Sequence, residues 1–140
     1  MRKIVFFFAL LMTLPCVSSA VDFYEALALV ESGGDPSAVG DGGRSVGLYQ
    51  IGRIYVDDVN RIAGSNFTYA DRYDPGKSRR MVEIYIAYYG RRYTRLTGCP
   101  ATFEVLAAIH NGGPDGWKKP ATRKHWRKMF EIMKSGSDLK

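Results

Sequence analysis

Apolar residues recur at helical spacing through most of the chain after residue 20, and this pattern predicts five helices joined by glycine-rich turns. The predicted starts carry capping residues, such as Asp22 followed three positions later by Glu25. The predicted ends carry glycines, which accept the left-handed backbone that often closes a helix. The predicted helices run over residues 22–32, 53–63, 75–96, 102–110 and 120–134.

Two of these segments have patterns that place them relative to the core. The segment 75–96 is basic at both tips and uncharged over 84–90, which predicts a helix that is apolar on all sides and passes through the core. In the segment 120–134 one face holds Trp126, Met129, Phe130 and Met133. The turn-rich stretch 35–51 leaves room for a short β-hairpin. The fold class is therefore mainly α.

The first twenty residues have the pattern of a secretory signal peptide. Arg2 and Lys3 precede an apolar run over 4–14, and small residues end the segment at Ala20. The run is shorter than the roughly 20 apolar residues that a membrane anchor needs, and it is followed by Pro15. We expect a secreted or periplasmic protein, with one domain over 21–140 and no membrane span after cleavage.

Composition narrows the function classes further. Leu, Ile, Val and Phe make up 34 of the 140 residues, which is too many for a disordered chain. Removal of the leader with Arg2 and Lys3 lowers the formal net charge from +6 to +4 and leaves Cys99 as the only cysteine. A lone cysteine excludes a disulfide framework. The basic residues of 118–128 fit the solvated face of a helix better than a nucleic-acid site, and the modest positive charge suits an anionic polymer such as a cell wall.

Several chemical motifs are absent or lack their context. No phosphate-binding loop is present, and His110 and His125 lie far apart in sequence without carboxylates at ligand spacing, so we expect no metal and no cofactor. The stretch 43–47 matches G-x-S-x-G around Ser45, with Asp74 and His110 later in the chain. That motif activates serine only on a turn from a buried strand to a helix, and the residues before it contain no such strand. A serine hydrolase is therefore disfavoured.

Glu31 is the strongest candidate for acid catalysis. It stands at the C-terminal end of an apolar helix, where the helix dipole and apolar neighbours both disfavour an ionised carboxylate. A general acid must carry its proton into the reaction. The alternative is an ordinary exposed glutamate in a last helical turn.

Two separated motifs resemble those of one enzyme superfamily. The first is E-S-G-G-D-P-S-A at 31–38 followed by G-L-Y-Q-I at 47–51, and the second is A-A-I-H-N-G-G-P-D-G-W at 107–117 followed by Thr122, His125 and Trp126. Together they resemble invertebrate-type lysozymes (the destabilase family) and, more distantly, lytic transglycosylases. The family pattern has tyrosine before the final tryptophan, where this chain has His125, and the family's many cysteines are missing.

The resemblance implies an α+β lysozyme-like fold, with helices around a long central helix and a small loop or β-hairpin segment that lines a cleft. It implies an enzyme, a muramidase that hydrolyses the β-1,4 bond between N-acetylmuramic acid and N-acetylglucosamine in peptidoglycan. Glu31 matches the proton donor, and Asp41 is the best match for the second carboxylate; Asp35 is the only other carboxylate in that loop. Four residues match the substrate-binding cleft: Tyr49, Gln50, His110 and Asn111.

Alternatives follow from the same resemblance. Core packing is the alternative role of Tyr49, because a small domain with nine tyrosines must bury several of them. A lytic transglycosylase would release 1,6-anhydro products and would need no second carboxylate. A non-catalytic protein that binds cell-wall glycan is the third possibility. In each case we expect a monomer whose partner is the peptidoglycan glycan strand.

Overall fold

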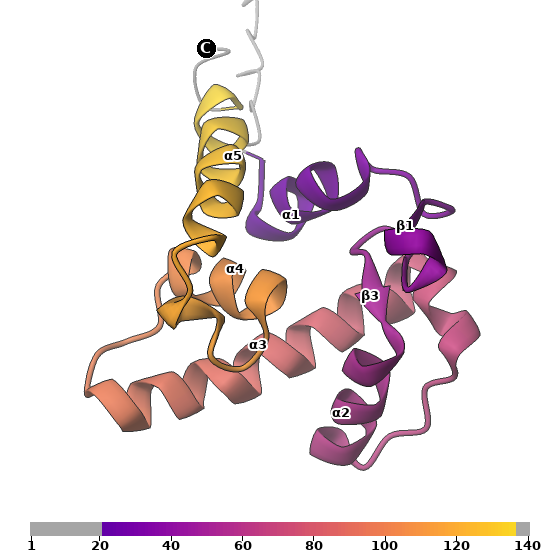
Figure 1. Ribbon diagram of the computed structural model, residues 1–140, viewed down its shortest axis with the longest axis horizontal. Helices are drawn as coiled ribbons and strands as arrows, with labels where there is room; N and C mark the ends of the chain where they lie inside the picture. Colours follow the sequence, from indigo (N-terminus) through magenta and orange to yellow (C-terminus); the bar gives the residue numbers. More distant parts are fainter. Residues whose placement is uncertain (1–20, 137–140) are drawn as a thin grey trace, which may run out of the picture.

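The computed structural model describes residues 21–136, so the predicted signal peptide over 1–20 lies outside the described residues. All five predicted helices are confirmed, with boundaries within two residues of those expected (Figure 1). They are α1 (Phe23–Ser32), α2 (Arg53–Ala63), α3 (Pro75–Thr97), α4 (Phe103–Gly112) and α5 (Thr122–Ser135).

Local capping explains why the helices begin and end where they do. At the start of α1, Oδ1 of Asp22 accepts the backbone N–H of Glu25 at 2.7 Å. Such a cap satisfies a donor that the first helical turn leaves free. At its end, Gly33 adopts the left-handed backbone with φ 69°. Because α1 ends there, Glu31 stands in its last turn, directly before the loop that leads to the sheet.

The segment after α1 forms three short antiparallel strands, one more than a hairpin. β1 (Val39–Gly40), β2 (Ser45–Val46) and β3 (Ile51–Gly52) lie in the order β1-β2-β3. Three 3-10 helices lie in the connections: η1 (Asp41–Gly43), η2 (Tyr69–Tyr73) and η3 (Gly116–Lys118). Such short turns have no extended apolar period, so the sequence pattern did not predict them.

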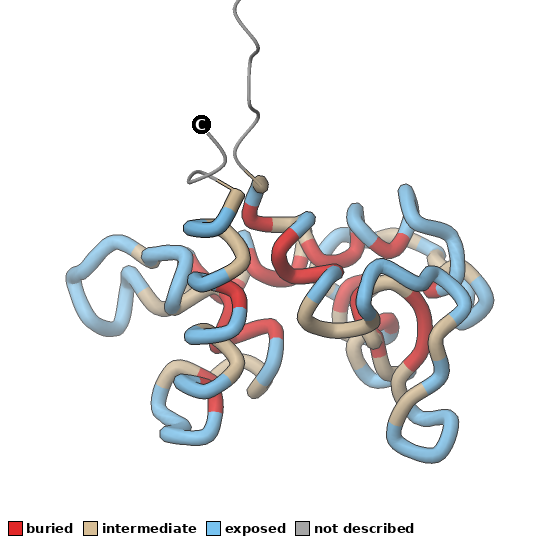
Figure 2. The backbone as a smooth tube through the Cα atoms, turned by 90° about the horizontal axis from the view of Figure 1, so that it is seen from above, coloured by how far each residue is buried: buried red, intermediate tan, exposed pale blue. Residues whose placement is uncertain are grey.

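The long helix α3 runs across the molecule below α1, α4 and α5 in the view of Figure 1 and carries much of the core. Met81, Val82 and Ile86 are buried on it. Figure 2 shows the buried segments of the backbone in the interior and the exposed ones mostly in the loops at the edges. The expectation that its middle is enclosed on all sides is wrong, because Ala87 is exposed and Tyr88 is only half-buried. An alanine in a helix does not require burial, so the absence of charge alone overstated how deeply the helix lies.

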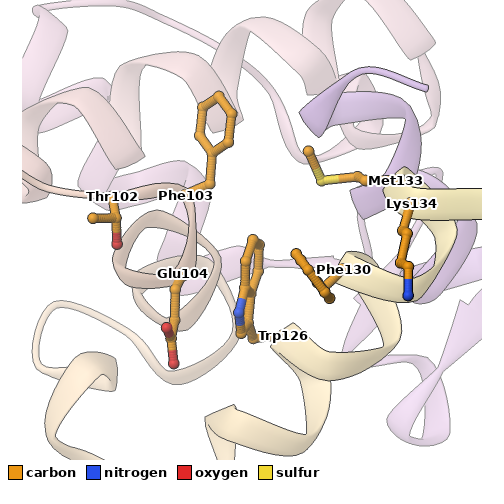
Figure 3. Close-up of a pocket in the computed structure, with 7 residues that line it drawn as sticks. All are labelled: Thr102, Phe103, Glu104, Trp126, Phe130, Met133 and Lys134. Carbon is orange, nitrogen blue, oxygen red and sulfur yellow. The ribbon is translucent and has the colours of Figure 1, made fainter. Parts of the chain in front are cut away.

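The apolar face predicted for α5 is present, but it is only partly buried. Met129 is fully buried, but Phe130 is 50% exposed. Trp126, Phe130 and Met133 instead line a groove of about 580 Å³ whose other wall is the start of α4, where Phe103 stands (Figure 3). The face of α5 that points to the core is therefore rotated toward His125 and Met129, and this rotation places His125 at the candidate site.

Two further observations concern export and redox chemistry. Among residues 21–136, no helix has both the length and the apolar character needed to cross a membrane. Cys99 is exposed, and its thiol is free. The fold of the described residues is therefore held together by its core and its hydrogen bonds.

Candidate active site

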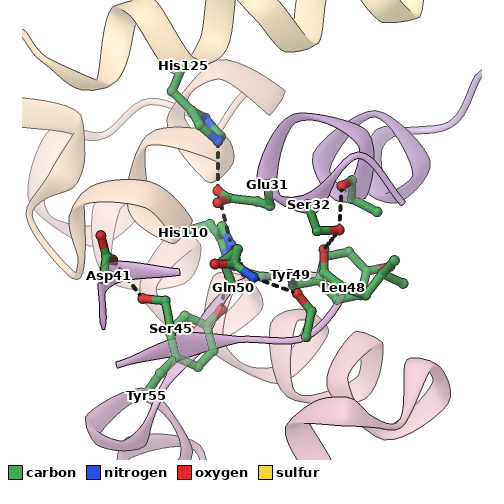
Figure 4. Close-up of polar contacts among 12 residues, drawn as sticks. Glu31, Ser32, Asp41, Ser45, Leu48, Tyr49, Gln50, Tyr55, His110 and His125 are labelled. Atoms are coloured by element: carbon green, nitrogen blue, oxygen red, sulfur yellow. Dashed lines mark hydrogen bonds and ion pairs between the residues drawn. The ribbon is translucent and has the colours of Figure 1, made fainter. Parts of the chain in front are cut away.

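A polar cleft of about 270 Å³ lies where the end of α1, the small sheet, α2 and the end of α4 meet (Figure 4). Every residue that lines it is polar, unlike the apolar groove beside α5. The lining residues are Glu31, Asp41, Ser45, Gln50, Tyr55, His110 and Asn111. The structure thus brings together five of the six residues that the sequence assigned to the site.

Glu31 is held by two histidines from other helices. Nε2 of His125 on α5 lies 2.8 Å from Glu31 Oε1, and Nε2 of His110 on α4 lies 3.6 Å from the same oxygen. The Glu31 side chain is 14% exposed. Glu31 is therefore not an ordinary exposed glutamate in a last helical turn, and it is not fully buried. The protein fixes one of its oxygens, and the carboxyl group borders the cleft.

The hydrogen bonds of His110 determine which of its nitrogens carries the proton. Its Nε2 lies 3.2 Å from the backbone oxygen of Tyr49, which can only accept, so the proton sits on Nε2. Its Nδ1 then accepts from the Tyr55 hydroxyl at 3.1 Å. Burial lowers the pKa of His110, which keeps the ring neutral. With both nitrogens engaged inside the protein, His110 positions Glu31 and the Tyr49 backbone.

Tyr49 is the one predicted site residue whose side chain lies elsewhere. Its side chain is 3% exposed and belongs to the hydrophobic core, and burial raises its pKa. Only its backbone oxygen takes part in the site, through His110. The alternative role considered for Tyr49, core packing, is therefore the one that its side chain has.

The two carboxylates of the loop after α1 have different surroundings. Asp41 lines the cleft, and its Oδ2 accepts the hydroxyl of Ser45 at 2.9 Å. Asp35 instead accepts both the backbone N–H and the hydroxyl of Ser37, and these bonds lower its pKa. Asp35 therefore stabilises its own turn, and Asp41 is the carboxylate that shares the cleft with Glu31.

Gln50 connects the loop to the sheet at the floor of the cleft. Its Nε2 donates to the backbone oxygens of Gly47 at 3.0 Å and Ala38 at 3.3 Å. A Cβ atom at Gly40 would lie 2.2 Å from Gln50 Oε1, so a larger residue there would displace the Gln50 amide from this position. Asn111 lines the cleft at the position after His110.

The serine-hydrolase interpretation finds no support in this geometry. Ser45 lies in a two-residue strand within the sheet, and its hydroxyl donates to Asp41. Asp74 caps α3 by accepting the N–H of Lys77. Within residues 21–136, no hydrogen bond joins Ser45 to a histidine. The structure therefore does not assemble a catalytic triad of serine, histidine and aspartate around Ser45.

His125 is the site residue that the sequence analysis missed. Its separation of 94 positions from Glu31 hid the contact, although its place in the second motif was a usable signal. Three titratable side chains do converge here, yet within residues 21–136 no group of three or more His, Cys, Asp or Glu side chains is arranged to hold a metal ion.

Comparison with known proteins relates this chain to one family. A lysozyme of Meretrix lusoria is 33% identical over 91 residues, which cover 65% of this chain and 70% of that protein. An invertebrate-type lysozyme of Ruditapes philippinarum is 31% identical over 91 residues, or 65% of this chain and 62% of that protein. The chain belongs to the invertebrate-type lysozyme family.

Further comparisons define the extent of this likeness. A chain in the crystal structure of Aeromonas hydrophila PliI in complex with Meretrix lusoria lysozyme matches with a TM-score of 0.66 and 28% identity, covering 79% of this chain and 87% of that chain. This match shows the lysozyme-like fold. A lysozyme of Magallana gigas is 33% identical over 62% of this chain, but the match spans only 59% of that protein. No protein-family model matches the chain.

Proposed function

We propose that this member of the invertebrate-type lysozyme family is an exported muramidase that hydrolyses the β-1,4 bond between N-acetylmuramic acid and N-acetylglucosamine. The observation that supports this most strongly is Glu31, with its Oε1 fixed by His125 in the polar cleft that Asp41 also lines. Most glycosidases use two carboxyl side chains that flank the bond to be cleaved. Family membership supports the choice of peptidoglycan as substrate.

The geometry divides the work between the two oxygens of Glu31. Both histidine contacts fall on Oε1, which leaves Oε2 to carry the acid proton toward the glycosidic oxygen. Asp41 supplies negative charge on the cleft wall, which favours the oxocarbenium-like transition state of the sugar. Hydrolysis is completed when a water oxygen bonds to the anomeric carbon and the water gives one proton to the Glu31 carboxylate, which restores the acid.

The first prediction concerns Glu31→Gln. The amide keeps the size of the side chain but cannot donate the acid proton, and general acid catalysis typically contributes about 10²–10⁴-fold to the rate. We expect loss of peptidoglycan clearing in a turbidity assay of that order, while the folded protein still sediments with cell walls. Glu25→Gln, which changes an exposed glutamate in the first turn of the same helix, is the matched control and should clear walls normally. Clearing by Glu31→Gln at the wild-type rate would overturn the assignment.

Product mass separates hydrolysis from the transglycosylase alternative. A transglycosylase uses the C6 hydroxyl of muramic acid and releases 1,6-anhydro ends that are lighter by one water. We expect hydrolytic ends in mass spectra of the released muropeptides, because Asp41 shares the cleft with Glu31. A protein that binds walls but releases no fragments would be the glycan-binding alternative. Export is tested by sequencing the mature N-terminus, which we propose to be Val21.

A further inference from the structure

His125 stands where the family pattern has tyrosine, and it makes the shortest contact to Glu31. Its Nε2 lies 2.8 Å from Glu31 Oε1, and its side chain is only 10% exposed (Figure 4). The other ring nitrogen, Nδ1, is buried and has no hydrogen-bond partner. One nitrogen of this ring thus has a hydrogen-bond partner and the other has none. This difference determines which nitrogen carries the proton.

The unpartnered Nδ1 disfavours the forms of His125 that carry a proton on this nitrogen. A proton on Nδ1 would bury an N–H donor without an acceptor, which costs free energy, whether the ring is neutral or an imidazolium ion. A bare Nδ1 leaves the single ring proton on Nε2, where Glu31 Oε1 accepts it. The same unpartnered nitrogen disfavours transfer of the acid proton of Glu31 to His125, because the imidazolium formed would bury an N–H on Nδ1 without an acceptor.

Groups from two other helices face the ring of His125. The titratable groups that face it are Glu31 from α1 and His110 from α4, and burial lowers the pKa of His110 so that this neighbour is neutral as well. The nearest cations on its own helix, Lys124 and Lys128, are exposed. The Glu31 oxygen thus meets one directed N–H, that of His125, because His110 gives its proton to the Tyr49 backbone. This N–H can bond both to the acid and to the carboxylate.

We propose that His125 is a positioning residue: it donates its Nε2–H to Glu31 Oε1, keeps the acid proton on Oε2, and stabilises the carboxylate left after that proton moves. This inference rests on the proposed function. In the step concerned, the C–O bond to the leaving sugar breaks, and its electron pair takes the proton from Oε2. Glu31 is left as a carboxylate whose Oε1 already holds a donor.

Substitutions at His125 separate this role from simple packing. In His125→Phe the donor is lost, so kcat should fall about 3- to 10-fold, the range of one net hydrogen bond, with little change in KM. Loss of the donor also makes ionisation of Glu31 harder, so the basic limb of the pH profile of kcat/KM should move to higher pH. His125→Gln places an amide N–H near the position of Nε2 and should restore both kcat and the wild-type limb.

The matched control is Met129→Leu, which changes a fully buried residue one turn along the same inward face of α5 without touching Glu31. It should leave both the rate and the pH profile unchanged. If His125→Phe lowers activity without moving the basic limb, or if His125→Gln fails to rescue while remaining folded, His125 is a packing residue and the proposal is wrong.

A second measurement does not depend on activity. Nitrogen-15 NMR of the imidazole rings in the wild-type protein should show His125 as the neutral Nε2–H tautomer at the pH of maximal clearing. An Nδ1–H tautomer or an imidazolium at that pH would overturn the proposal. If the wild-type protein releases no sugar fragments, the proposed function fails, and the tautomer measurement still decides what His125 does.

Discussion

At the scale of residues, a single oxygen, Oε1 of Glu31, is contacted by histidine side chains from two other helices. These contacts fix the orientation of the Glu31 carboxyl group. The neighbouring carboxylates show the same dependence on surroundings. Asp35 and Asp41 lie in one loop and have the same chemistry, but Asp35 bonds to its own turn and Asp41 faces the cleft. Asp41 also has a left-handed backbone with φ 50°, which aspartate and asparagine tolerate better than most residues.

This difference between the two carboxylates gives a prediction. Asp41→Asn keeps the size of the side chain and tolerates the left-handed backbone, but it removes the negative charge from the cleft, so clearing should fall at least about 10-fold. Asp35→Asn, the matched control in the same loop, should clear walls normally. A fully active Asp41→Asn together with anhydro products would make Asp41 an ordinary loop residue and the protein a transglycosylase.

At the scale of elements, the sheet is held against η2 by a buried arginine. Arg72 is 6% exposed and donates to the backbone oxygens of Tyr69 at 2.7 Å and Ile51 at 3.0 Å. The loop before β3 passes directly over the backbone of the same residue: a Cβ atom at Gly47 would lie 2.0 Å from the Arg72 carbonyl oxygen. The floor of the cleft is thus fixed by a backbone contact.

Two glycine substitutions test this contact. Gly47 and Gly42 both have a positive φ, 79° and 65°, but a Cβ at Gly42 would meet nothing within 4 Å. Gly42→Ala should therefore cost only the roughly 1 kcal/mol of a left-handed backbone. Gly47→Ala adds a clash with backbone and should cost about 1–3 kcal/mol more. Urea denaturation measures both, and equal losses would contradict the close approach.

At the scale of the whole molecule, Glu31 and its two histidines come from α1, α4 and α5, which lie above α3 in Figure 1. The side chains of both histidines are no more than 10% exposed, so they are also part of the packed interior. His110 illustrates the consequence. Its ring is buried between the site and Tyr55, and its hydrogen bonds connect α4 to α2 and to the sheet region. The protonation state of the site is therefore coupled to the stability of the fold.

This coupling predicts how stability depends on pH. Burial lowers the pKa of His110 in the folded protein. In the unfolded chain the same ring takes up its proton at about pH 6.5. Below that pH the unfolded state binds the additional proton, so the free energy of unfolding should fall as the pH decreases from about 7.5 to 5.5. Above this interval the contribution of neutral His110 to stability should be fully present. Urea denaturation at both pH values measures the slope.

The control for this slope is His110→Gln, which has no titrating ring. It should be less stable overall, but its free energy of unfolding should change less across the same interval. Ordinary aspartate and glutamate side chains titrate below it, near about 3.9 and 4.3, and so contribute little there. A wild-type protein whose stability is the same at both pH values would contradict a buried neutral His110.

The sequence by itself determined the five helices and selected Glu31 as the candidate acid. Caps such as Asp22 and terminators such as Gly33 act within one helical turn, so the five helices followed from neighbouring residues. The motif around Glu31 likewise needed only local residues. Tertiary packing alone decided that Tyr49 enters the core, that Asp41 rather than Asp35 reaches the cleft, and that His125 meets Glu31 from 94 positions away. These outcomes depend on how α5 is rotated against α1 and α4, and no periodicity along the chain encodes that rotation.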